Sequence, residues 1–134
     1  MKKLLIIGFV AVAAAIGLAA GKGDKVMTKS SDGTYVVNTT TICDAKGFKG
    51  ATPLEVHIKK GKVVKVVALK NAETPAYFAK VNKYLIPLFT GKKLTDARTQ
   101  ADAQKVDGCT GATFSTRAVQ KNIKAALDYY EKHK

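Results

Sequence analysis

The sequence is poor in the residues that usually carry metal, haem or acid–base chemistry. It contains only two histidines and two cysteines, and no C-x-x-C or C-x-x-C-H motif occurs. His57 and His133 have no second ligand at metal-binding spacing, so we expect both on the surface and no metal site. No group of paired carboxylates or histidines suggests a substrate pocket with its own general acid and base.

Acidic residues are also scarce, and 10 of them against 23 lysines and arginines give a formal net charge of +13. A basic balance of this kind often indicates nucleic-acid binding. Here the lysines are spread along the chain, and no basic run interleaved with aromatic residues occurs. We therefore expect no nucleic-acid partner, but a positively charged surface that favours anionic ligands and anionic membranes.

The one long apolar run lies at the N-terminus. Met1-Lys2-Lys3 is basic, residues 4–18 are apolar or small, and Ala19-Ala20-Gly21 offers small residues to a signal peptidase. The run is also near the lower limit for a membrane span, so an uncleaved anchor is the alternative to a cleaved signal peptide. Both alternatives predict an exported protein, either periplasmic or anchored in the membrane and facing away from the cytoplasm.

We divide the chain into a signal peptide or anchor at 1–21, a linker at 22–33 and one domain at 34–134. The linker is polar and rich in glycine and serine. Within the domain, β-branched residues predict a strand at 34–41. Alternating apolar residues predict a hairpin with arms at 54–59 and 63–69, after a loop that contains Gly47 and Gly50.

Three helices are predicted after the hairpin. The first begins at Glu73-Thr74-Pro75, and Pro87 should kink or end it near Ile86. A short helix is expected at 94–102, and a longer one begins near 114–116. The first and last helices each have an apolar face, formed by Phe78, Val81, Leu85 and Leu88 and by Val119, Ile123, Ala126 and Tyr130. The predicted fold class is α+β, an antiparallel sheet with helices packed on it.

Residues 107–116 form the stretch with the most distinctive chemistry. Two glycines and several hydroxyl or carboxylate side chains occur just before a predicted helix. Small residues let a ligand approach the backbone, and hydroxyls with free N–H groups at a helix start form an anion site. The stretch is typical of either a plain helix cap or a site for a phosphate-bearing ligand.

This stretch resembles the flavinylation motif of the FMN-binding domain family. The motif is Asp, two spacers, Ser or Thr, Gly-Ala-Thr, one spacer, then Ser or Thr. Asp107, Thr110-Gly111-Ala112-Thr113 and Ser115 match it. The family includes flavin-carrying subunits of the Rnf complex and of the sodium-translocating quinone reductase.

Two weaker matches precede the motif in the family's order. Gly47-Phe48-Lys49-Gly50 resembles the family's Gly-aromatic-x-Gly loop, and Glu73-Thr74-Pro75 resembles its Glu-Thr-Pro turn. Together with the motif, the resemblance covers about residues 47–122.

The resemblance implies that a flavin transferase takes FAD, releases AMP and attaches FMN through a phosphoester to the last hydroxyl of the motif, here Ser115. Thr116 offers a second hydroxyl, but the position in the motif favours Ser115. No histidine lies near Ser115 in sequence, so the transferase is expected to activate the hydroxyl. Asp107 would be recognised by the transferase or bind its metal.

The resemblance also implies a wider set of flavin contacts. For Glu73 and Thr74 a plain helix start is an equal alternative. The loops that hold Cys43 and Cys109 would both approach the flavin, which implies a possible disulfide or a close thiol pair. The implied cofactor contacts are Gly47, Gly50, Glu73, Thr74, Thr110, Gly111, Ala112, Thr113, Phe114 and Thr116.

The sequence thus favours an exported electron-transfer flavoprotein with covalent FMN, a substrate of the FMN transferase rather than a stand-alone enzyme. Its redox donor and acceptor proteins are not identified by any motif. One alternative is a module that binds FMN or another anionic ligand without a covalent bond. Another is an exported structural domain without flavin.

The N-terminal pattern makes a direct prediction. Edman sequencing of the mature protein should start within a few residues of Gly21, because the small residues before it suit a signal peptidase. Met1 on a membrane-extracted protein would identify the anchor instead. Met1 on a protein recovered from the cytoplasm would contradict export.

Overall fold

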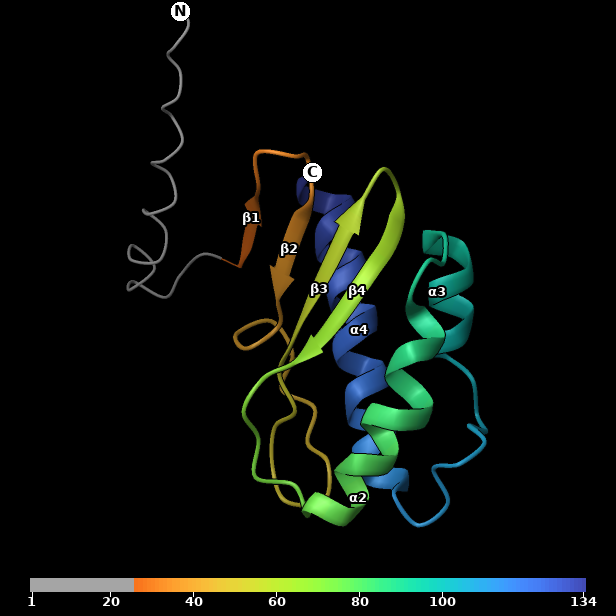
Figure 1. Cartoon of the computed structure of the whole chain (residues 1–134). Helices are drawn as coiled ribbons and strands as arrows, with labels where there is room; N and C mark the ends of the chain where they lie inside the picture. Colours follow the sequence, from red (N-terminus) through yellow and green to blue (C-terminus); the bar gives the residue numbers. More distant parts are fainter. Residues whose placement is uncertain (1–25) are drawn as a thin grey trace, which may run out of the picture.

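The computed structural model describes residues 26–134 (Figure 1). The signal peptide or anchor expected at 1–21 and the first part of the linker expected at 22–33 lie outside the described residues. Within 26–134, no helix combines the length and the apolar character that a membrane span requires.

Four antiparallel strands form one sheet in the order β1-β2-β3-β4. The strands are β1 (Met27–Lys29), β2 (Tyr35–Asn38), β3 (Leu54–Lys59) and β4 (Lys62–Ala68). β3 and β4 are the predicted hairpin. Its turn has positive φ at both Lys60 and Gly61, as the tightest hairpin turns require. β1 lies inside the segment that we expected to be a linker, so the sheet gains an edge strand.

The first helical segment changes its winding along its length. α2 (Pro75–Lys80) continues into a π-helical turn, η2 (Val81–Leu85), and a 3-10 turn, η3 (Ile86–Phe89). The α-helical winding already ends at Lys80, before the predicted position, and the change to 3-10 winding at Ile86 lies next to Pro87, which has no N–H to donate. The prediction that Leu88 belongs to the buried apolar face is wrong, since Leu88 is exposed and Phe89 is buried. The π-helical and 3-10 turns rotate these last residues relative to a regular α-helix.

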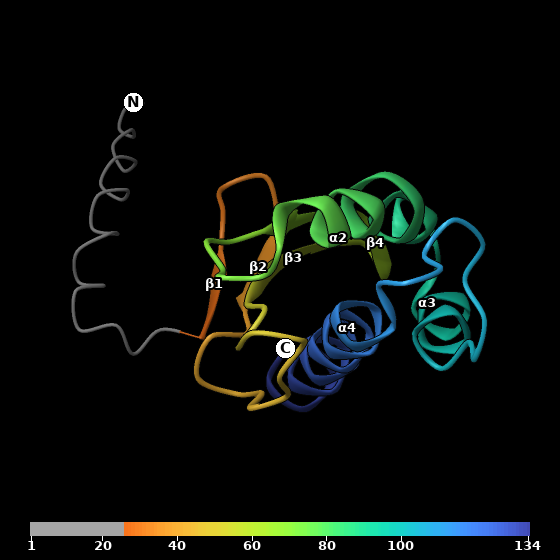
Figure 2. The same ribbon diagram turned by 90° about the horizontal axis from the view of Figure 1, so that it is seen from below.

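The last two helices are α3 (Leu94–Ala101) and α4 (Thr113–His133). α4 packs across β2 and β3, while η3 and α3 pack against β4 (Figures 1 and 2). Alternate residues of β3 are buried, and so are all four residues of the predicted face of α4: Val119, Ile123, Ala126 and Tyr130. The α+β prediction is therefore confirmed, with one core between the sheet and the helices.

Ion pairs tie α3 to the far half of α4. The guanidinium of Arg98 donates to Asp128 at 2.5 Å and to Glu131 at 2.9 Å. At the opposite end of the molecule, the lower end in Figure 1, the loop before β3, the start of α2 and the start of α4 come together. These are the three segments whose motifs resemble the flavin-binding segments of the family.

Candidate functional site

The carboxylate of Glu73 connects the three segments. It accepts hydrogen bonds from the backbone N–H groups of Phe48 at 2.8 Å, Lys49 at 2.5 Å and Gly50 at 3.1 Å, and from the hydroxyl of Ser115. Burial acts to raise the pKa of Glu73, but these hydrogen bonds outweigh it, so the pKa lies below its usual value. Glu73 is therefore a buried anion with four donors.

Gly47 is required by this arrangement. A Cβ at Gly47 would lie 2.3 Å from Oε1 of Glu73 and 3.2 Å from Cα of Ser115, so no larger residue fits. The N–H of Gly47 donates to the carbonyl of Gly50 at 2.8 Å, which closes the loop. Gly47 and Gly50 thus shape the loop around Glu73. Thr74 begins α2 through its backbone, and its hydroxyl makes no capping bond.

The motif loop is held against α2 and η2. Gly108 has a φ of 89°, and a Cβ there would lie 2.3 Å from the ring of Tyr84. The ammonium of Lys80 donates to the carbonyl of Thr110 at 2.7 Å. The buried thiol of Cys109 lies 3.7 Å from the carbonyl oxygen of Lys80. These contacts present Asp107, Thr110 and the positive-φ residue Gly111 at the surface.

α4 sorts the hydroxyls of the motif into two groups. Thr113, its first residue, is exposed, whereas Ser115 and Thr116 are 1% and 3% exposed. Residues two apart on a helix point in nearly opposite directions, which explains the contrast between Thr113 and Ser115. The hydroxyl of Ser115, the attachment point that the family motif implied, is buried and donates to Glu73.

The start of α4 is open to an anion. The N-cap residue is Ala112, which is buried, and no side chain caps the first turn. The first N–H groups of a helix have no partner within the helix, and here they lie at the positive end of a 21-residue helix. Such a terminus is suited to a phosphate group.

An exposed aromatic pair lies beside the helix start. Phe48 and Phe114 are 54% and 63% exposed, and their rings stack with centroids 6.3 Å apart and planes 24° apart. The rings of Phe48 and Tyr77 form a T-shaped pair with centroids 5.9 Å apart. Exposed aromatic surface of this kind fits a planar ligand. From the sequence we named Phe114 but overlooked Phe48 and Tyr77, although Phe48 lies within the Gly-aromatic-x-Gly match.

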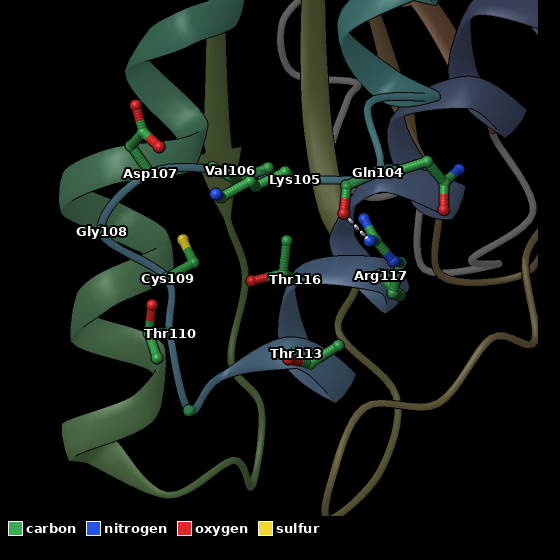
Figure 3. Close-up of a pocket in the computed structure, with 11 residues that line it drawn as sticks. Gln104, Lys105, Val106, Asp107, Gly108, Cys109, Thr110, Thr113, Thr116 and Arg117 are labelled. Atoms are coloured by element: carbon green, nitrogen blue, oxygen red, sulfur yellow. Dashed lines mark hydrogen bonds between the residues drawn. The ribbon is translucent and has the colours of Figure 1, made fainter.

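A pocket of about 270 Å³ is formed between the motif loop and the start of α4 (Figure 3). Its walls are the loop from Gln104 to Gly111 and the residues Thr113, Thr116 and Arg117 at the start of α4. The guanidinium of Arg117 donates to the carbonyls of Ala103 and Gln104, which fixes the loop to the helix.

The cysteines do not form the possible disulfide, since both are free thiols. Cys109 lines the pocket in Figure 3, while Cys43 is half-buried and lines a separate pocket beside Thr40. His133 is exposed as predicted, but His57 is half-buried beside Glu55. Within residues 26–134 no group of side chains could hold a metal ion.

Comparison with known proteins gives the family of the chain. The sequence model of the FMN-binding domain family matches residues 47–128. A subunit of the proton-translocating ferredoxin:NAD(+) oxidoreductase complex of Clostridium ljungdahlii is 31% identical over 115 residues, which cover 82% of this chain and 57% of that protein. No solved structure matches the chain.

Two Vibrio relatives are each named as a subunit of an ion-translocating oxidoreductase complex. The protein of Vibrio atlanticus is 33% identical over 92 residues, 62% of this chain and 44% of its own. The protein of Vibrio vulnificus is 27% identical over 118 residues, 81% of this chain and 55% of its own. The chain thus spans about half the length of the curated relatives it matches.

The role of Glu73 is testable by unfolding. Glu73→Gln keeps one acceptor but loses the charge, so we expect the free energy of unfolding at pH 7 to fall by about 1–3 kcal/mol. Because the folded pKa is lowered, this contribution is present above the unfolded pKa of about 4.3 and is lost as the pH falls through the folded value. Urea unfolding at pH 7 and at lower pH should show the difference from wild type shrinking.

Glu131→Gln is the matched control, because Glu131 forms an exposed ion pair with Arg98. It should cost at most about 1 kcal/mol. Equal stability of wild type and Glu73→Gln at pH 7 would contradict the role of Glu73.

Proposed function

Because the chain belongs to the FMN-binding domain family, we propose that it is an electron-transfer flavoprotein whose FMN is bound covalently at the start of α4. The observation that carries the proposal is an exposed threonine, Thr113, at an open helix start beside an exposed aromatic pair. A bound flavin takes up and releases one or two electrons, while the protein sets its orientation, access and potential.

Thr113 is the attachment residue in this proposal, in place of Ser115. Thr113 is exposed at the first position of α4, where an ester phosphate would meet the positive end of the helix. The hydroxyl of Ser115 is engaged by Glu73. Thr110 is also exposed, but it lies in the loop, three residues before the helix begins.

The attachment reaction needs only an accessible hydroxyl from this chain. The Thr113 oxygen forms a bond to the phosphorus of the FMN half of FAD, the pyrophosphate bond breaks and AMP leaves. The hydroxyl proton passes to a base of the transferase, since a threonine hydroxyl needs activation. Asp107 is exposed on the same loop, which suits recognition by that enzyme.

The residues around Thr113 suit both parts of the cofactor. The stacked rings of Phe48 and Phe114 offer aromatic surface to the isoalloxazine. Lys80, held beside the motif by its bond to Thr110, adds positive charge near the ester. Glu73 would not contact the flavin itself, but it positions the loop that carries Phe48.

The cellular setting is part of the proposal. The N-terminal pattern supports export, with residues 1–21 as a signal peptide or anchor and the domain extending at least from β1 to Lys134. The relatives are named as subunits of oxidoreductase complexes, which supports redox partner proteins and membrane association for this chain. An FMN transferase that uses FAD is the remaining partner.

Co-expression with an FMN transferase tests the attachment residue. Wild type should gain the mass of one FMN, and the flavin should stay with the chain after denaturation. Thr113→Val has a similar shape without the hydroxyl and should carry no covalent flavin. Intact-mass spectrometry of the denatured proteins reads out each result.

Ser115→Ala and Thr110→Val are the controls and should both keep the flavin. Ser115→Ala should cost about 1 kcal/mol of stability, because Glu73 loses one donor. Loss of flavin from Ser115→Ala but not from Thr113→Val would return the attachment to Ser115. A flavin that leaves wild type on denaturation would support the non-covalent alternative.

A further inference from the structure

Thr116 is a buried hydroxyl that the fold leaves without a partner. Its side chain is 3% exposed, and its Oγ1 has no hydrogen-bond partner among residues 26–134. The hydroxyl points into the pocket that the motif loop forms with α4 (Figure 3). An unpartnered buried hydroxyl is costly, so native proteins seldom keep one without a reason.

The pocket places this hydroxyl close to the proposed ester. Thr113 and Thr116 both line the pocket. They are three residues apart on α4, and residues at this spacing are neighbours on one side of a helix. A phosphate bonded to the Thr113 oxygen would therefore lie on the side of the helix that carries Thr116.

The charges around the pocket suit an anion. The side chains of Lys105 and Arg117 line it, and the open first turn of α4 borders it. Asp107 is the acidic residue of the lining, and its carboxylate points away from Thr116 (Figure 3). The local field therefore favours a phosphate at the position that Thr116 faces.

We propose that the pocket is the phosphate subsite of the flavin site and that Thr116 is a positioning residue, whose hydroxyl donates to a non-bridging oxygen of the ester phosphate on Thr113. The inference rests on the proposed covalent FMN and names a group that holds it. With the phosphate turned into the pocket, the ribityl chain leaves on the outer side, toward Phe114 and Phe48. Covalent attachment of FMN then supplies the hydrogen-bond acceptor that the Thr116 hydroxyl lacks.

Three proteins test this inference: wild type, Thr116→Val and Thr116→Ser, each with and without covalent FMN. In the unmodified protein, Thr116→Val should raise the melting temperature by roughly 2–6 °C, because a methyl group replaces an unpartnered hydroxyl. Attachment of FMN should raise the melting temperature less in Thr116→Val than in wild type, because the variant cannot donate a hydrogen bond to the phosphate. The ³¹P chemical shift of the ester should change in Thr116→Val and be restored in Thr116→Ser.

A lower melting temperature of unmodified Thr116→Val would show that the hydroxyl already has a partner, and would overturn the inference. An unchanged ³¹P shift together with an unchanged gain on loading would also overturn it, while leaving covalent FMN intact. Absence of covalent FMN from wild type would instead overturn the proposed function.

Inorganic phosphate tests the subsite without any flavin. Titrated into the unmodified protein, it should shift the amide NMR signals of residues 113–117 in a saturable way. The apparent affinity should be several-fold weaker in Thr116→Val than in Thr116→Ser. Equal affinity in the two variants, or no saturable shift in wild type, would overturn the subsite.

Discussion

The arrangement of the site depends on one buried carboxylate. Glu73 collects three successive backbone N–H groups from the loop at Phe48–Gly50 and a hydroxyl from α4. An isolated buried charge is costly, but one with several hydrogen-bond donors is stabilised and holds their segments in place. A single side chain therefore fixes the loop relative to the helix, and Gly47 is the contact point that lets them approach.

This constraint also decides which groups face solvent. Because Ser115 is drawn inward to Glu73, Thr113 and Phe114 are turned outward, where Phe114 meets Phe48. A second buried network supports the same loop from behind: Asn122 of α4 accepts from Thr39 and donates to Thr52. The surface at the start of α4 thus follows from polar contacts inside the domain.

Local patterns predicted much of this structure. The hairpin and the buried face of α4 follow from periods of two and about 3.6 residues, and the loop-to-helix start follows from its glycines and hydroxyls. β1 was missed because three residues carry no periodic signal and the strand is defined only by pairing with β2. The burial of Ser115 was missed because it depends on Glu73, which is 42 positions away in sequence. The residues adjacent to Thr116 and Cys109 in sequence likewise do not predict which way these two side chains point.

The aromatic pair has a consequence for the protein before its cofactor arrives. Phe48 and Phe114 each keep more than half of their accessible surface, which makes an apolar patch at one end of the molecule. Patches of this kind favour self-association, whereas a net charge of +13 keeps copies apart. Salt screens that repulsion. The tendency of the chain to self-associate therefore depends on the balance between attraction at the apolar patch and electrostatic repulsion between copies. A cofactor that covered the two rings would reduce that attraction.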